Sequence, residues 1–274
     1  MVLLSGCKIN IGLYLTHKRT DGYHEINTIF YPIPFYDVLE SVTSPYFALS
    51  TTGIKIDAPP EENLCVKAYN LLRHNYVQLP NIKLHLHKNI PSGAGLGGGS
   101  ANATNTMQLL NMKYKLQINK DKLQYYAAQL GSDCAFFINN TPAYGTGRGE
   151  IVNPIALNLV GYTLVLIMPG LHISTTQAFA GINPAMPAYG LLQAIEQPIG
   201  TWKNNICNQF EKTVFAQHPI LLTYKNMLYK SGAVYASMSG SGSTVYGIFD
   251  CTVAEVARLL PQKIKSINHK VIGL

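Results

Sequence analysis

The chain of 274 residues is long enough for one large domain or two ordinary ones with a sizeable buried core. Apolar residues make up 47% and charged residues 13% of it, a balance that is typical of folded proteins and excludes an intrinsically disordered chain. The formal net charge is +7, but lysine and arginine are scattered without basic runs, which favours small polyanions over nucleic acid as partners.

The N-terminal sequence MVLLSGCKIN has no basic segment followed by a long apolar core, so we expect no signal peptide. The most apolar stretch, LVGYTLVLIM at 159–168, is far shorter than the roughly 18 residues of a membrane span and is typical of a strand. We therefore expect a cytoplasmic protein that does not bind membranes.

The first third of the chain is rich in strand signals. Residues 8–15, KINIGLYL, carry apolar side chains with a period of two, which predicts a strand. A turn is predicted at 18–22, where Asp21-Gly22 is a common turn dipeptide. The other elements predicted here are strands over 25–33, 37–44 and 82–88, a hairpin pair around Thr52-Gly53 in 47–57, and a helix over 63–76.

A glycine-dense loop, PSGAGLGGGS at 91–100, follows the strand at 82–88. It matches the GxGxxG pattern of dinucleotide sites, but the next 30 residues look helical and lack the second strand that ends in an acid. A Walker A loop fails because no lysine precedes Ser100. There remain a structural turn and an anion cradle at a helix N-terminus, and the cradle is favoured because a turn needs fewer glycines.

The rest of the chain mixes helices and strands. Ser100 is predicted to cap a helix that ends near Met112. The further elements predicted are helices over 120–130, 191–196, 202–215 and 221–230, a glycine-rich turn over 141–150, a strand over 160–168, and a closing helix and strand after the glycine- and serine-rich stretch 235–249. We predict an α+β protein of two lobes, 1–155 and 156–274, with a ligand site at their junction.

Two charged residues stand out against apolar surroundings. Lys8 lies in an otherwise apolar strand and shares a face with Asn10, and Asp133 stands directly before an apolar run. Either residue could be structural, as an edge-strand charge or a helix cap. An aspartate beside an ammonium group could instead accept a proton from a hydroxyl group, although the sequence alone does not show that Lys8 and Asp133 meet.

The five cysteines are far apart and form no CxxC motif, so we expect reduced thiols without a zinc site or a disulfide framework. Cys7 and Cys134 stand next to the candidate residues, and a buried filler is favoured over a thiol nucleophile for both. His85 and His87 alternate along a predicted strand, where a solvated face is favoured over a metal site.

Four segments together resemble the GHMP kinases, a superfamily that includes galactokinase, homoserine kinase and mevalonate kinase. PSGAGLGGGSANAT resembles the superfamily's ATP-binding signature. KINIGLYLTHKRTDGYHEINTIFYPI, GSDCAFF and SMSGSGSTVYGIF resemble the corresponding motifs of the 4-diphosphocytidyl-2-C-methyl-D-erythritol kinases within it. The four segments occur in the expected order and span residues 5 to 249.

This resemblance implies a two-lobed GHMP kinase fold with a ribosomal S5-like N-terminal lobe and a ferredoxin-like C-terminal lobe. It implies transfer of the γ-phosphoryl group of ATP, with Mg²⁺, to the 2-hydroxyl of 4-diphosphocytidyl-2-C-methyl-D-erythritol, a step of the non-mevalonate route to isoprenoid precursors. The partner is then this small molecule, with no nucleic acid and no membrane, and the protein a monomer or homodimer.

The resemblance also implies roles for particular residues. Asp133 matches the catalytic aspartate and Lys8 the lysine that holds it ionised and offsets developing charge. Asn10 matches an asparagine near the acceptor. The residues expected at cytosine are Tyr23, His24 and Phe179. The triphosphate cradle is expected at Pro91, Gly93, Gly95, Leu96, Gly97, Gly98, Gly99 and Ser100, the adenine contacts at Asn63 and Lys88, and the loop over the substrate phosphates at Ser239, Gly240, Ser241 and Gly242.

Some positions depart from the motifs, among them Cys7, Ala101, Ala135 and Gln209. None of them removes a proposed chemical group, but no acidic ligand for Mg²⁺ is evident beyond Asp133, so its ligands stay unassigned. A homoserine-type or mevalonate-type kinase remains an alternative, and so, from another class, do a non-catalytic nucleic-acid-binding module and an NAD-linked oxidoreductase.

Overall fold

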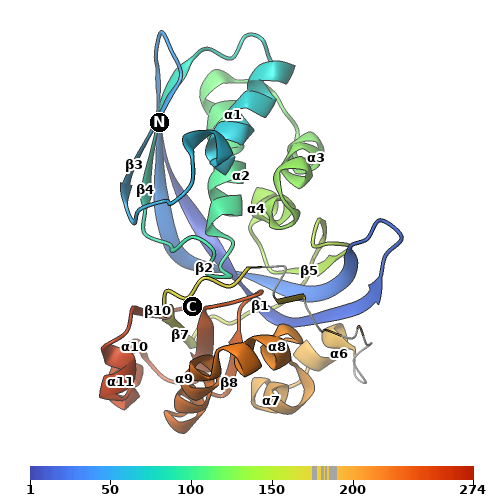
Figure 1. Cartoon of the computed structure of the whole chain (residues 1–274), viewed down its shortest axis with the longest axis vertical. Coiled ribbons are helices and arrows are strands. Elements are labelled where there is room, and N and C mark those ends of the chain that lie inside the picture. The colour runs from blue at the N-terminus through green and yellow to red at the C-terminus, as the bar shows by residue number, and fades with distance from the viewer. Residues whose placement is uncertain (175–177, 180–181, 183, 185–189) are drawn as a thin grey trace.

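The computed structural model describes residues 1–174, 178–179, 182, 184 and 190–274, which form two β-sheets with helices packed on them (Figure 1). The strand order is β3-β4-β2-β5-β6 in the first sheet, where β1 also pairs with β2, and β10-β7-β9-β8 in the second. The strands are β1 (Val2–Lys18), β2 (His24–Thr43), β3 (Ala48–Gly53), β4 (Ile82–Lys88), β5 (Ala143–Thr146), β6 (Ile151–Pro154), β7 (Thr163–Ile167), β8 (Tyr235–Met238), β9 (Val245–Phe249) and β10 (His269–Gly273).

The helices of the described residues are α1 (Leu64–Asn75), α2 (Gly98–Tyr114), α3 (Lys120–Leu130), α4 (Phe136–Asn139), α6 (Leu191–Ile195), α7 (Trp202–Asn205), α8 (Phe210–Gln217), α9 (Pro219–Lys230), α10 (Val253–Leu259) and α11 (Gln262–Lys265). Helices α1 to α4 cover one face of the first sheet (Figure 1). Helices α8 to α11 pack on one face of the second sheet, whereas α6 and α7 pack in the core on its other face, together with β1. The predicted α+β class with two lobes is confirmed.

The second sheet is buried on both faces, and successive side chains along its strands point alternately into two different cores. Along β7, Val165 and Ile167 belong to the core that includes Leu221 and Leu228 of α9. Leu164 and Leu166 belong instead to the core that contains side chains of β1. Because the two faces bury different partners, the whole of β7 reads as one apolar run in the sequence.

Strand β1 is shared by both halves of the molecule. Its residues Cys7, Ile9 and Ile11 lie in the core with the second sheet, and the alternate residues Lys8 and Asn10 are also buried, on the opposite face. The strand predicted over 8–15 is confirmed, but it is longer and covered on both sides, because one face meets the second sheet and the other meets the glycine loop.

Several further predictions are confirmed. The helices expected over 63–76 and 120–130 are α1 and α3, and the side chains of Asn63 and Asn119 accept hydrogen bonds from the first-turn N–H groups of Cys65 and Lys122. The strand expected over 82–88 is β4, which leads directly into the glycine loop. Each of these elements is set by a local pattern of apolar residues and caps.

Two predictions around the glycine loop are wrong. The segment around Thr52-Gly53 is no hairpin, because β3 pairs in parallel with β4 and the chain leaves the sheet after Gly53. Ser100 does not cap α2, because the helix begins at Gly98, with Gly97 as its cap in the left-handed conformation at φ 68°.

Two predictions in the later part are wrong in detail. The turn expected over 141–150 contains strand β5, and its last residues form the tight turn around Gly147 that leads into β6, the antiparallel partner of β5. The helix expected over 202–215 is interrupted after α7, because Cys207 and Gln209 hydrogen-bond to the backbone of Leu13 in β1. The predicted domain boundary at 155/156 falls between β6 and β7 and stays a prediction. No helix in the described part of the chain has the length and apolar character needed to cross a membrane.

Candidate active site

Two glycine-rich loops, 91–97 before α2 and 239–244 between β8 and β9, are joined directly to each other. The N–H of Thr244 donates to the carbonyl oxygen of Ala94 at 3.1 Å. The hydroxyl of Ser239 donates to the carbonyl oxygen of Gly95 at 2.8 Å. Gly95 has φ 78°, and a Cβ there would overlap the carbonyl oxygen of Ser239. Glycine at 95 is therefore required by the contact between the loops.

The glycines at the start of α2 meet different surroundings. A Cβ on Gly97 would lie 3.1 Å from Lys8 Cε, and a Cβ on Gly98 would lie 2.9 Å from Ile90 Cγ2. Gly99 is different, because it is exposed and the nearest atom to a Cβ there is Leu64 Cδ1 at 3.8 Å. No neighbour among the described residues explains glycine at 99, so the backbone is left open to a bound group at a helix N-terminus, where free N–H groups and the helix dipole favour an anion.

Lys8 and Asp133 meet beside these loops. Lys8 Nζ lies 3.1 Å from Asp133 Oδ2, donates to the carbonyl oxygen of Gly95 at 3.2 Å, and donates to Asn10 Oδ1. The side chain of Lys8 is only 3% exposed, whereas that of Asp133 is 31% exposed. The ammonium group therefore has all three of its hydrogens engaged, and the carboxylate is the member of the pair that a ligand can reach.

Asn10 holds the ammonium group in place. Its Nδ2 donates to Thr28 Oγ1 at 2.9 Å, and Thr28 in turn donates to the carbonyl oxygen of Gly12 at 2.6 Å. The backbone N–H of Asn10 donates to Ser239 Oγ at 3.2 Å. This chain of hydrogen bonds fixes the orientation of the amide, so that its oxygen points at Lys8.

A pocket of about 290 Å³ opens beside the Lys8–Asp133 pair. It is lined by Lys8, Asn10, Leu13, Tyr23, His24, Ile26, Ser132, Asp133, Arg148, Phe179, Phe210, Gly240 and Ser241. The structure thus brings together most of the residues expected to act on or bind the acceptor substrate. Ser239 and Gly242 lie in the same loop as Gly240, and Asn208 Nδ2 supports that loop by donating to the carbonyl oxygens of Met238 and Gly240, both at 2.8 Å.

The aromatic side chains of this pocket are arranged in two groups. The rings of His24 and Phe179 stack with centroids 5.1 Å apart, and Phe179 meets Phe210 edge to face at 4.9 Å. Tyr23 is 56% exposed. The spacing of His24 and Phe179 leaves no room for another ring between them, so Tyr23 is the exposed aromatic ring of this pocket.

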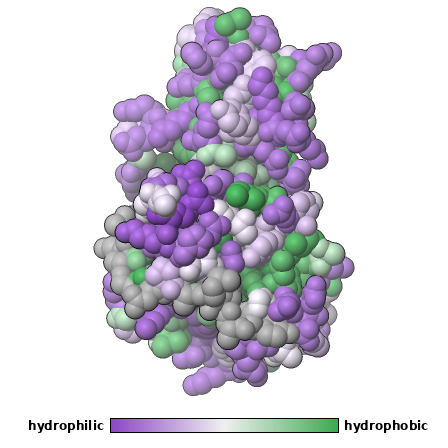
Figure 2. All heavy atoms as spheres, turned by 90° about the vertical axis from the view of Figure 1, so that its right-hand side faces the viewer, coloured by the Kyte–Doolittle hydropathy of each residue, from purple (hydrophilic) through white to green (hydrophobic). Residues whose placement is uncertain are grey.

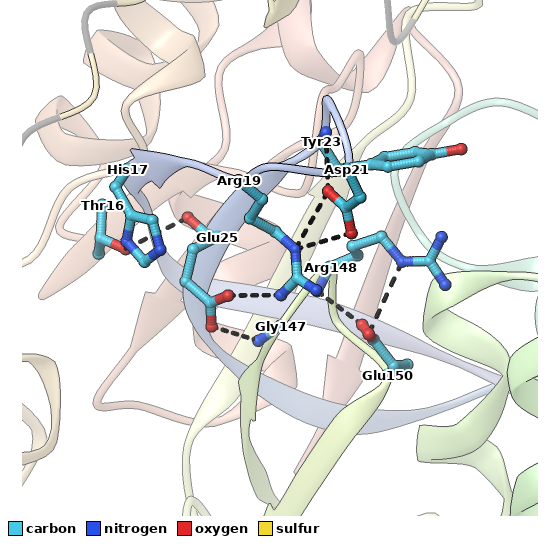
Figure 3. A network of polar contacts seen from close by, with 9 residues as sticks. All are labelled: Thr16, His17, Arg19, Asp21, Tyr23, Glu25, Gly147, Arg148 and Glu150. Carbon is cyan, nitrogen blue, oxygen red and sulfur yellow. Dashed lines mark hydrogen bonds and ion pairs between the residues drawn. The ribbon is translucent and has the colours of Figure 1, made fainter.

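The turn that carries Tyr23 and His24 is held by a polar network (Figure 3). Asp21 Oδ1 accepts the N–H of Tyr23 at 3.1 Å, and this bond, together with the Arg19 guanidinium, holds the pKa of the Asp21 carboxyl below its ordinary value. Arg19 Nη1 donates to Glu25 Oε2 at 2.7 Å, and Glu25 Oε1 accepts the N–H of Gly147 at 2.6 Å. Glu25 therefore ties the β1–β2 hairpin to the turn between β5 and β6.

This network lies at the surface. Figure 2 shows the side of the molecule that faces right in Figure 1, and a strongly hydrophilic patch lies at mid-height there, the level at which the β1–β2 hairpin projects. Sequence reasoning missed Arg19, Glu25 and Arg148. Arg148 stands between two glycines in the stretch 141–150, and no pattern in the sequence distinguishes it from an ordinary turn residue.

A second pocket of about 590 Å³ lies on the other side of the glycine loop. Pro91 and Gly93 line it together with residues 54–58 and His172. Of the two residues expected at adenine, Asn63 caps α1 close to this region, but Lys88 is only 1% exposed and forms an ion pair with Asp37 beneath the loop. The structure does not bring the Lys88 side chain to either pocket.

The buried pair of Asp37 and Lys88 holds the start of the glycine loop. Asp37 Oδ1 accepts the N–H groups of Asn89 at 2.7 Å and Ile90 at 2.9 Å, and Oδ2 accepts Asn102 Nδ2 at 2.9 Å in addition to the Lys88 ammonium. With four donors on one buried carboxylate, Asp37 is well satisfied, which a buried ion pair requires.

The cysteines next to the site are buried fillers. Burial raises the pKa of the Cys134 thiol to about 12 and also raises that of Cys7 well above its ordinary value. A thiol that stays protonated is a poor nucleophile, so neither residue suits covalent catalysis. In the described residues no three His, Cys, Asp or Glu side chains are grouped as metal ligands.

Two family models match the chain. The model described as GHMP kinases N terminal domain matches residues 63–141, and that described as GHMP kinases C terminal matches residues 191–263.

Curated relatives cover nearly the whole chain. A protein of Bacteroides thetaiotaomicron named 4-diphosphocytidyl-2-C-methyl-D-erythritol kinase is 49% identical over 254 residues, which are 91% of this chain and 92% of that protein. A protein of Parabacteroides distasonis with the same name is 46% identical over 250 residues, again 91% of this chain and 92% of its own length.

Solved structures agree with these relatives. A crystal structure of a 4-(cytidine 5'-diphospho)-2C-methyl-D-erythritol kinase superposes with a TM-score of 0.85 at 28% identity, covering 99% of this chain and 98% of its own. The mevalonate kinase of Methanococcus jannaschii, at 11% identity and a TM-score of 0.70, covers 99% of this chain and 96% of its own and shares the fold alone. The identity and coverage of the curated relatives show that the chain belongs to the 4-diphosphocytidyl-2-C-methyl-D-erythritol kinase family of the GHMP kinases.

Proposed function

We propose that this protein is an ATP-dependent kinase that phosphorylates the 2-hydroxyl of 4-diphosphocytidyl-2-C-methyl-D-erythritol, in the non-mevalonate route to isoprenoid precursors. The observation that carries the proposal is the Lys8–Asp133 ion pair of 3.1 Å, which lies between an anion-binding helix N-terminus and a pocket lined by Tyr23. Phosphoryl transfer depends on positioning and on stabilising charge, and this arrangement supplies both.

Asp133 accepts the proton of the substrate hydroxyl while the oxygen of that hydroxyl forms the new bond to the γ-phosphorus. The bond from that phosphorus to the β,γ-bridging oxygen breaks, and ADP leaves. Lys8 forms an ion pair with Asp133 and offsets charge that develops on the transferred group. Because Asn10 and Gly95 also bind the ammonium group, Lys8 is held in a single position during transfer.

Nucleotide binding follows from the two pockets. The exposed backbone at Gly99 and the first turn of α2 form the cradle for the triphosphate, and the pocket at Pro91 and Gly93 takes the nucleoside of ATP. The side chain of Lys88 is buried against Asp37, so an adenine contact at Lys88 would come from its backbone. The cytosine of the acceptor substrate stacks on Tyr23, with His24 and Phe179 forming the adjoining wall.

Mg²⁺ is expected with ATP, because it takes oxygen ligands and neutralises the β- and γ-phosphates. Asp133 fits as one ligand, since its carboxylate is partly exposed in the pocket, and the other ligands would be phosphate oxygens and water. We further propose that the protein works in the cytoplasm as a monomer or homodimer and needs no nucleic acid.

The test is ADP release from Mg·ATP with and without 4-diphosphocytidyl-2-C-methyl-D-erythritol. We expect strong stimulation by this substrate, and a loss of about 10²-fold or more in kcat for Asp133→Asn. Asp121→Asn, the same change on the exposed first turn of α3, is the matched control and should behave like the unaltered protein. Stimulation that survives in Asp133→Asn would refute the role of Asp133.

The alternative within the superfamily is a kinase for homoserine or mevalonate. Those alcohols have no base to stack on Tyr23, so we expect neither to stimulate ADP release. Stimulation by one of them, without any by the cytidyl substrate, would overturn the proposed substrate and leave the kinase chemistry in place.

A further inference from the structure

Arg148 is a cation that lines the pocket beside Lys8 and Asp133, called the acceptor pocket below. None of the motifs above gives Arg148 a role. It lies in the turn between β5 and β6, flanked by Gly147 at φ 71° and Gly149 at φ 114°. Its N–H donates to Glu150 Oε2 at 2.6 Å, which fixes the turn. The pocket that it lines also contains Asp133, the residue proposed to receive the substrate proton.

The Arg148 guanidinium lies over the ring of Tyr23. The distance from Arg148 Cζ to the ring centroid is 4.8 Å, within the range of a cation–π contact. The only carboxylate that pairs with it among the described residues is Glu150, whose Oε1 lies 3.6 Å from Nε. Figure 3 shows the two terminal nitrogens of Arg148 on the side that faces away from Glu150. These nitrogens carry four of the five guanidinium N–H donors.

The positions of Tyr23 and Arg148 are coupled through the backbone. Glu25 joins the hairpin that carries Tyr23 to the N–H of Gly147, the residue before Arg148. Arg19 holds Glu25 from the other side at 2.7 Å. A base that stacks on the other face of Tyr23 would therefore have a guanidinium group at a defined position across the ring.

The pocket needs such a group because its other cation is already engaged. Lys8 is bound by Asp133, Asn10 and Gly95 and has no hydrogen left for a second anion. The nucleotide that acts as acceptor in the proposed function carries a diphosphate. A planar guanidinium matches two phosphate oxygens at once and can stack on an aromatic ring at the same time.

We propose that Arg148 is a substrate-binding residue that recognises the diphosphate of the cytidyl substrate while its flat face rests on Tyr23. This inference rests on the proposed function for the identity of the substrate. Arg148 then sets the affinity for a nucleoside diphosphate over a nucleoside, and it takes no part in the transfer step.

The test measures the affinities of cytidine, CMP and CDP by calorimetry without ATP, so that no turnover is needed. The unaltered protein should bind CDP about tenfold or more tightly than cytidine, as charge-assisted hydrogen bonds to phosphate predict. Arg148→Gln should abolish most of that difference and change cytidine affinity only a few-fold. Arg148→Lys should retain part of it, since the charge stays but the planar pair of donors is lost.

The control is Arg258→Gln, the same substitution at an exposed position on α10, which should leave all three affinities unchanged. In steady-state kinetics Arg148→Gln should raise KM for the cytidyl substrate with kcat nearly unchanged. An equal loss of affinity for cytidine, CMP and CDP would overturn the proposal, because Arg148 would then act only by supporting Tyr23. Unaltered ratios would overturn it as well. Failure of the proposed function would show separately, as absence of substrate-stimulated ADP release in the unaltered protein.

Discussion

Alanine at Gly95 and at Gly99 should have opposite effects, although the two glycines are only four residues apart. At Gly95 a left-handed backbone with a Cβ costs about 1–2 kcal/mol. The Cβ would also overlap the carbonyl oxygen of Ser239 and lie 3.0 Å from that of Gly242, and such overpacking costs about 1–3 kcal/mol. Gly95→Ala should therefore lower the free energy of unfolding by about 2–5 kcal/mol, because the two loops are forced apart.

Gly99 has neither constraint. It lies in the first turn of α2 with open space around it, so alanine should stabilise the helix by up to about 1 kcal/mol. If the phosphates of ATP approach this backbone, the added methyl group blocks them. Gly99→Ala should then raise KM for ATP by about tenfold or more, which corresponds to a loss of about 1.4 kcal/mol in binding free energy. The KM for the cytidyl substrate should change little.

The assay is urea unfolding followed by circular dichroism, combined with initial rates at varied Mg·ATP. A Gly95→Ala protein as stable as the unaltered one would refute the argument that the loop contact excludes a side chain. A Gly99→Ala protein with an unaltered KM for ATP would refute the phosphate cradle at α2. The two variants serve as controls for each other, because both add a single methyl group to the same loop.

Three further predictions concern other parts of the molecule. Tyr23→Ala should raise KM for the cytidyl substrate by the equivalent of about 1–3 kcal/mol of lost stacking and leave KM for ATP nearly unchanged. Equal increases in the two KM values, measured from steady-state rates, would contradict base stacking. Asp37→Asn should lower the free energy of unfolding, measured in urea, by about 3–5 kcal/mol, because it leaves the Lys88 ammonium buried without a charge partner. A loss below about 1 kcal/mol would contradict this role of the ion pair. Burial raises the pKa of the Cys65 thiol to about 11 and that of the Cys134 thiol to about 12, from 9.0. The stability that these protonated thiols contribute is therefore fully present below pH 9 and is lost as the pH rises from there. Equal free energies of unfolding at about pH 8.5 and about pH 10.5, under reducing conditions, would contradict this prediction.

Elements with strong local signals could be predicted from the sequence. The helix over 120–130 ends where predicted, because an asparagine cap precedes it and Gly131 follows it. The strand over 8–15 was evident from its alternation. The meeting of Lys8 and Asp133, which are 125 positions apart, was expected only from the resemblance to known kinases, since no pattern within one segment encodes a contact at that distance.

Errors arose where a long-range contact overrides a local preference. Thr52-Gly53 has the composition of a hairpin turn, but the parallel partner of β3 is β4, some 35 residues later. Ser100 has the chemistry of a helix cap, but α2 begins earlier, after a left-handed Gly97 at which a side chain would crowd Lys8 and Phe137. The burial of the Lys88 side chain also depends on a long-range contact, the one with Asp37, while the expected place of Lys88 at adenine stays a prediction.

Arg148 shows a different limit. A single arginine between glycines carries no periodicity, cap or motif, so its sequence context is that of an ordinary solvated turn. Its position next to Tyr23 depends on the bond between Glu25 and Gly147, two residues that are 122 positions apart. Residues that give a pocket its specificity are often of this kind, because loops carry them and a distant scaffold positions them.

The sharing of β1 between the two sheets has a consequence for how this protein can be divided. Leu13 bonds to Cys207 and Gln209 of the second half, while Lys8, five residues earlier, bonds to Leu96 of the first. A break between β6 and β7 would separate sequence segments but would leave the second sheet without the apolar strand that covers it. The two lobes are therefore inseparable as folding units, and neither could be exchanged for its counterpart from another kinase without carrying β1 along.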